Sequence, residues 1–240
     1  MKNLQLDSKL DINETKNKIE QTRLKLEALI KSEDSSSVVM QEFKKQIDLI
    51  NQILFEFHSN DSNAPDVLLH KSEKLEEIGC ILLKAASKYQ ESFSEFLFQQ
   101  VKHLGLWFQG TGKEYEIHAL VKRTAKPSEQ QIIQYIKLIT DFVENYWETH
   151  PEEILEREEL ALQIVEADKS GMSNKYREVS QRFIDTVFSS VEKVRLKEIK
   201  SSSRNVQHIL DWVMNSPSWQ GDDFESCFEI VKNSRIQAEF

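Results

Sequence analysis

Apolar residues return at every third or fourth position through most of this chain, which is the period of one face of an α-helix. The longest unbroken pattern runs from Val67 to Leu104 and contains no proline. Pro65 stands where its first turn would begin, and Gly105 offers a left-handed residue that would end it. Such a helix would be roughly 60 Å long at about 1.5 Å per residue, so we predict the spine of an elongated bundle.

Two shorter helices are predicted before this spine. Residues 8–32 carry a narrow apolar stripe of the kind found in coiled-coil seams, with Asp7 or Ser8 as the cap. Residues 38–57 carry a broader stripe, and the polar segment between the two runs is short enough for an antiparallel turn. Residues 1–60 are therefore predicted to form an N-terminal helical hairpin.

The segment 105–126 is the least regular part of the chain, and it contains Gly105, Gly110 and Gly112. Two interpretations are equally compatible with its pattern. In one, the residues near 106–122 form a small β-hairpin across the glycines. In the other, a helix runs from Glu114 to Arg123, and the sequence does not decide between them.

Three more helices are predicted in the C-terminal half. One begins within residues 126–129 and ends at His150-Pro151. An acidic one begins at Pro151, because proline fits the first turn of a helix. A long one begins near Ser173, and the three serines at 201–203 are expected to bend or break it. Residues 61–214 would then be the main bundle of an all-α fold, and residues 215–240 a C-terminal tail helix.

Composition narrows the class of protein. Six glycines and four prolines in 240 residues are too few for the turns of an all-β fold. The net charge of −9 argues against broad attraction to DNA or to anionic lipid. The chain shows neither a leader-like apolar segment nor the 18–20 apolar residues of a membrane span, so we expect a cytoplasmic protein with no membrane partner. Cys80 and Cys227 are expected to be small buried residues.

Residue patterns typical of catalysis are weak in this sequence. The six histidines are scattered, without Glu-x-x-His or paired Cys-x-x-Cys spacing, so we predict no metal, and no other cofactor is indicated. Arg204, Asn205 and His208 resemble the motif of helical ribonucleases of the HEPN type, although three residues intervene where that family has four to six. A nuclease is therefore one alternative, while the interpretation as a whole leans away from an enzyme.

A second alternative is a helical subunit of a complex that binds RNA or single-stranded DNA. Cations alternate with aromatic residues between positions 102 and 126, and such a mixture can hold a single strand through phosphate contacts and stacking. Glu114 and Glu116 dilute the charge. The candidate nucleic-acid residues are Lys102, Trp107, Lys113, Lys122, Arg123 and Lys126.

The C-terminal tail contains the most specific sequence motif in the chain. The run Trp219-Gln-Gly-Asp-Asp-Phe-Glu-Ser-Cys227, followed by Ser234-Arg235 and Ala238-Glu-Phe240, resembles the C-terminal tails of small cyanobacterial antitoxins of the VapB-like class. The resemblance covers about 25 residues and implies a segment that wraps a toxin. The residues expected to contact a partner are Trp219, Asp222, Asp223, Phe224, Phe228 and Phe240.

These observations favour a non-enzymatic regulatory protein that binds another protein, a toxin or a complex subunit, through helical surfaces and the tail. An antitoxin-like inhibitor is the sharpest form of this hypothesis. Self-association through the N-terminal hairpin is an additional mode that the coiled-coil-like stripe allows.

Overall fold

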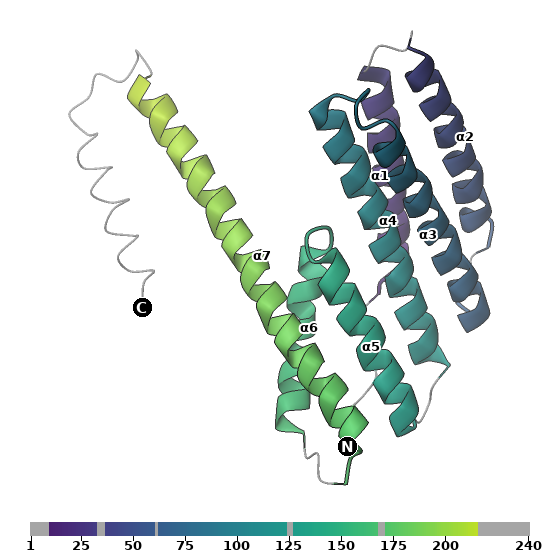
Figure 1. Cartoon of the computed structure of the whole chain (residues 1–240), viewed down its shortest axis with the longest axis vertical. Coiled ribbons are helices and arrows are strands. Elements are labelled where there is room, and N and C mark those ends of the chain that lie inside the picture. The colour runs from purple at the N-terminus through teal and green to yellow at the C-terminus, as the bar shows by residue number, and fades with distance from the viewer. Residues whose placement is uncertain (1–9, 33–36, 61, 124–126, 168–170, 216–240) are drawn as a thin grey trace. The chain divides into compact units, whose positions relative to one another are not determined.

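A computed structural model describes residues 10–32, 37–60, 62–123, 127–167 and 171–215, with side chains described as far as residue 198. This part of the chain is built of α-helices and contains no strand, as an all-α multi-helix bundle requires (Figure 1). The helices are α1 (Ile12–Ser32), α2 (Val38–His58), α3 (Pro65–Lys88), α4 (Glu95–Lys122), α5 (Glu129–Tyr146), α6 (Pro151–Glu166) and α7 (Asn174–Asn215). The chain divides into two units, Met1–Val194 and Arg195–Phe240.

Most helices begin where a polar side chain can accept a hydrogen bond from the first turn. Ser37 accepts one from Met40, and Ser128 forms a capping box with Gln131. The cap of α1 is Asp11, whose Oδ1 accepts hydrogen bonds from the next turn, whereas the predicted caps Asp7 and Ser8 lie outside the described residues. These caps are local features, so they can be recognised in the sequence without knowledge of the fold.

The predicted spine from Val67 to Leu104 is wrong, because the run is two helices joined by a turn. The backbone amides of Ser92 and Phe93 both donate to the carbonyl of Tyr89, and Ser94 then caps α4. Tyr89 and Phe93 remain buried, and the Phe93 ring packs 5.1 Å from that of Phe43. The turn therefore keeps its apolar residues in the core, so the apolar period continued through it and concealed the break.

The expected stop at Gly105 is also wrong, and the segment 106–122, left open above, lies inside α4. Gly105 of α4 and Gly79 of α3 are explained by the close approach of these two helices. A Cβ added to Gly79 would lie 2.7 Å from the carbonyl oxygen of Gly105, and one added to Gly105 would lie 2.9 Å from the Cγ of Leu83. Glycine is therefore present in these helices because two backbones touch, which outweighs its helix penalty of about 1 kcal/mol.

Unit Met1–Val194 contains two hydrophobic clusters that meet at α4. The first cluster is formed by α1, α2, α3 and α4 and includes Phe43, Phe57, Phe108 and Tyr115. The second is formed by the end of α4 with α5, α6 and the first half of α7, and includes Ile117, Phe142, Tyr176 and Phe183. Tyr115 and Ile117 face different clusters although they are two residues apart, so α4 is the helix around which this unit is organised.

The other two departures from expectation are local. The structure has α7 as one helix from Asn174 to Asn215, so the break expected at residues 201–203 is wrong. Serine costs only a few tenths of a kcal/mol in a helix, and neither glycine nor proline interrupts this stretch. Cys80 is exposed instead of buried, and Nε2 of Gln109 donates to its sulfur at 3.4 Å.

Candidate functional site

The residues predicted to bind a protein partner all belong to the tail, and the tail lies outside the described residues. These are Trp219, Asp222, Asp223, Phe224, Phe228 and Phe240. Lys126 also lies outside the described residues. The backbone of α7 continues through Arg204 and His208, but their side chains are not described. The tail and the nuclease hypothesis therefore stay predictions.

The described members of the cation-and-aromatic set lie along α4 and the residue that follows it. From Lys102 to Arg123 the chain advances by about 30 Å, so these residues are spread along the helix. Lys113 is engaged by Glu116 at 2.6 Å, and Arg123 forms an ion pair with Asp66. Trp107 is partly buried and packs inward. Two of the cations are thus already paired with carboxylates.

One face of the N-terminal hairpin presents two large apolar side chains to solvent. Asn51 of α2 donates a hydrogen bond to Glu27 of α1 at 3.4 Å, which fixes the level at which the two antiparallel helices face each other. Leu24 lies one turn before Glu27, and Phe55 lies one turn after Asn51, so both fall at the same level. Leu24 is 51% exposed and Phe55 is 79% exposed. We call this pair the hairpin face.

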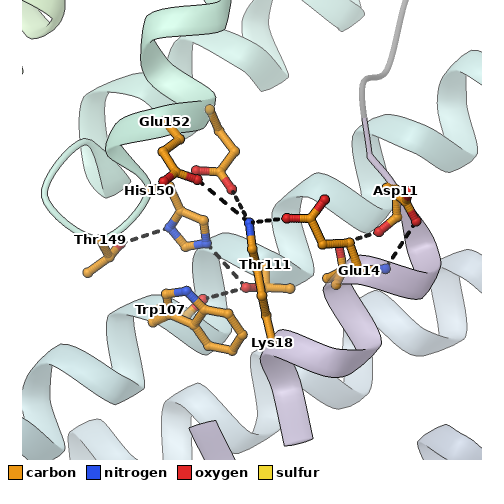
Figure 2. Close-up of polar contacts among 10 residues, drawn as sticks. Asp11, Glu14, Lys18, Trp107, Thr111, Thr149, His150 and Glu152 are labelled. Carbon is orange, nitrogen blue, oxygen red and sulfur yellow. Dashed lines mark hydrogen bonds and ion pairs between the residues drawn. The ribbon is translucent and has the colours of Figure 1, made fainter. Parts of the chain in front are cut away.

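A buried histidine joins the turn between α5 and α6 to α4. His150 is 2% exposed, and its Nδ1 and Nε2 lie 2.9 Å and 3.2 Å from the hydroxyls of Thr149 and Thr111. Thr111 also donates to the carbonyl of Trp107 at 2.9 Å. Figure 2 shows the imidazole between the two threonines. Burial, with smaller contributions from His103 and Lys18, lowers the pKa of His150 to about 3, so the ring is neutral near pH 7.

Gly110 makes room for this ring. A Cβ at Gly110 would lie 2.3 Å from Cε1 of His150, a distance that real Cβ atoms do not adopt, and 3.0 Å from Cγ of Tyr146, which is a tight contact. The imidazole therefore rests directly on the backbone of α4. Both ring nitrogens have hydroxyl partners within the protein, so His150 is best explained as a structural link between helices.

Beside His150 lies a small polar pocket, of about 110 Å³, between the first turns of α1 and α6 and one side of α4. Its rim is acidic and includes Asp11, Glu14, Glu153 and Glu156. The ammonium of Lys18 reaches in from α1 and lies 3.1 Å from Glu14 and 3.7 Å from Glu153 (Figure 2). We call this the acidic pocket.

Two buried side chains line the acidic pocket and form no hydrogen bond within the described residues, although the charge of Arg157 acts on Glu114. Arg157 of α6 is 6% exposed, and its Nε makes no hydrogen bond in the described part of the chain. Glu114 of α4 is 7% exposed, and no described group hydrogen-bonds to its carboxyl. Burial, followed by the negative charge of Glu153, raises the pKa of Glu114 to about 8, so this carboxyl is mostly protonated at pH 7.

Sequence reasoning missed this pocket although its residues carried a signal. Arg157 is the lone cation among eight acidic residues in 148–168, and Glu114 follows Lys113 within α4. Each is explained equally well as a solvated charge on a helix face. Only the packing of α1 and α6 against α4 brings the two side chains into one buried space.

Comparisons with known proteins add no relative. No family model, no curated protein and no solved structure matches the chain. Within the described residues, no three His, Cys, Asp or Glu side chains are arranged to hold a metal ion. None of the described helices combines the length and the apolar content needed to cross a bilayer.

Proposed function

We propose that this chain is a non-enzymatic regulatory protein that binds another protein through its helical surfaces and its C-terminal tail. The observation that carries the proposal is the hairpin face, where Phe55 is the most exposed of the described large apolar side chains and Leu24 lies at the same level. Exposing a phenylalanine to water costs roughly 1.5–3 kcal/mol relative to burying it. A partner that covers both side chains would recover that free energy.

The tail provides the second part of the proposal. Its aromatic residues, Trp219, Phe224 and Phe228 among them, are spaced as anchors for a groove on a partner, and acidic residues lie between them. Its resemblance to VapB-like antitoxin tails makes an inhibitor of a toxin the sharpest form of the proposal. The hairpin face and the tail would then be two contacts with one partner, which raises affinity through effective concentration.

The test is photo-crosslinking of the full chain, with a benzoyl-phenylalanine placed at position 55, in the cells that make the protein. The matched control carries the same group at Asp48, which is exposed on the same helix but polar. We expect a covalent adduct with a second kind of protein from position 55 and none from position 48. Equal labelling from both positions, or no adduct at all, would contradict the hairpin face as a contact.

A deletion of residues 216–240 separates the contribution of the tail. We expect the adduct from position 55 to weaken strongly while the far-ultraviolet circular dichroism per residue stays helical. An adduct whose yield is unchanged by the deletion would remove the tail from the proposal. If the adduct is instead a second copy of this chain, the hairpin face belongs to a homo-oligomer, and the proposal of a heterologous partner at that face is wrong.

A further inference from the structure

The acidic pocket is lined by two buried ionisable side chains, Arg157 and Glu114, that form no hydrogen bond within the described residues. A guanidinium taken out of water costs several kcal/mol unless something pairs with it. The side chain of Arg157 is only 6% exposed, yet no ion pair to it occurs among the described residues. Glu114 lines the same space without a hydrogen bond. The floor of the pocket therefore offers unused hydrogen-bond donors.

The rim of the pocket has the opposite character. Glu14, Glu153 and Glu156 contribute carboxylates, and Lys18 is the cation among them. The Lys18 ammonium lies within hydrogen-bond distance of Glu14 only, since its distances to Glu153 and Glu152 are 3.7 Å and 3.8 Å. Negative charge at the rim exceeds what one ammonium neutralises. A second positive group would be favoured there.

We propose that the acidic pocket binds a small zwitterion, an α-amino acid with a short side chain. Its carboxylate would accept hydrogen bonds from the Arg157 guanidinium and from the Glu114 carboxyl at the floor. Its ammonium would lie at the rim, near Glu153 and Glu156. A purely cationic ligand would meet the charge of Arg157 at the floor, and a purely anionic one would have to pass the carboxylates of the rim.

The size of the pocket agrees with this class of ligand. A volume of about 110 Å³ exceeds that of one water molecule, about 30 Å³ in the liquid, and leaves no space for a nucleotide or a peptide. Its lining comes from α1, α4 and α6, so an occupant would connect these three helices. The neutral form of Glu114 that burial favours is also the form that donates to a carboxylate.

The test is isothermal titration calorimetry of the full chain with three probes, L-alanine, propionate and ethylammonium. Propionate carries only the carboxylate of L-alanine, and ethylammonium carries only its ammonium group. We expect saturable binding of L-alanine, and binding of each single-ended probe weaker by about tenfold or more, which corresponds to 1.4 kcal/mol. Propionate or ethylammonium binding as tightly as L-alanine would overturn the zwitterion assignment, and so would the absence of saturable binding by L-alanine.

Variants locate the site. Arg157→Met keeps the length of the buried chain but removes the floor charge, and Glu153→Gln removes one rim carboxylate from a position that tolerates change because its side chain is 24% exposed. We expect each to weaken L-alanine binding about tenfold or more, while Asp48→Asn, exposed on α2, leaves it unchanged. If Arg157→Met fails to fold, Glu153→Gln carries the test alone.

Undiminished binding in Glu153→Gln would place the ligand elsewhere and overturn the assignment. This proposal does not depend on the protein partner.

Discussion

The imidazole of His150 lies parallel to the indole of Trp107, with ring centroids 5.9 Å apart and planes 6° apart. The contact joins the turn between α5 and α6 to the middle of α4. Trp107 packs against the first hydrophobic cluster, while Phe142, whose ring meets His150 edge-on at 5.4 Å, belongs to the second. His150 therefore lies where the two clusters of the unit meet, and its environment should control stability.

Gly110→Ala should destabilise the protein because the new methyl group enters the space of the imidazole. Overpacking of this kind typically costs roughly 1–3 kcal/mol. Urea unfolding of the single variants Gly110→Ala and His150→Ala and of the double variant would measure the coupling. We expect the double variant to be more stable than the sum of the single effects predicts, because removing the ring makes room for the methyl group. Simple additivity would show that the two residues do not compete for space.

The stability of the wild type should fall, relative to Glu114→Gln, as the pH rises from about 4.5 to about 8. The pKa of Glu114 is near 4.5 in the unfolded chain and about 8 in the folded one, so across this range the folded state holds a proton that the unfolded state has lost. By linkage, that difference lowers the free energy of unfolding with increasing pH, in total by roughly 2–5 kcal/mol. Urea unfolding at pH 4, 6 and 8.5 would measure it. A constant difference between the two proteins would show that Glu114 titrates normally.

Relative to the variant His150→Gln, the stability of the wild type should depend on pH in the opposite direction. The pKa of His150 is near 6.5 in the unfolded chain and about 3 in the folded one, so below pH 6.5 the unfolded state gains a proton that the folded state cannot bind. Relative to the glutamine variant, the wild type should therefore lose stability as the pH falls from about 6.5 to about 3. Nuclear magnetic resonance titration of the ring gives a direct check, and a ring that protonates near pH 6.5 in the folded protein would refute the prediction.

Gly79→Ala should destabilise the contact between α3 and α4, although alanine is the better helix former. Its Cβ would lie 2.7 Å from the backbone oxygen of Gly105, which cannot move aside as a side chain can. We expect a loss of roughly 1–3 kcal/mol in the free energy of unfolding. Cys80→Ala, at the next and exposed position, is the matched control and should stay within about 0.5 kcal/mol of the wild type. A stabilised Gly79→Ala would mean that the two backbones separate more easily than the packing indicates.

Helix positions were largely predictable because their signals are local. Ser128, within the predicted start at residues 126–129, and Pro151 mark the starts of α5 and α6 in the sequence, and the structure places those starts there. A cap or a first-turn proline acts within four residues of itself, so no knowledge of the fold is needed to interpret it. The all-α class follows from the same period and from the scarcity of glycine and proline.

The remaining features depended on contacts between distant parts of the chain. Gly105 was interpreted as a helix end because glycine usually is one, but here it allows the backbone of α3 to approach. The turn at Tyr89 was hidden because its side chains stay in the core. Glu114 and Arg157 are 43 positions apart, and neither is unusual until α6 packs against α4 and buries both charges in one pocket. Periodicity decided that this protein is helical, whereas burial, which only the tertiary structure sets, decided which of its polar residues need a partner.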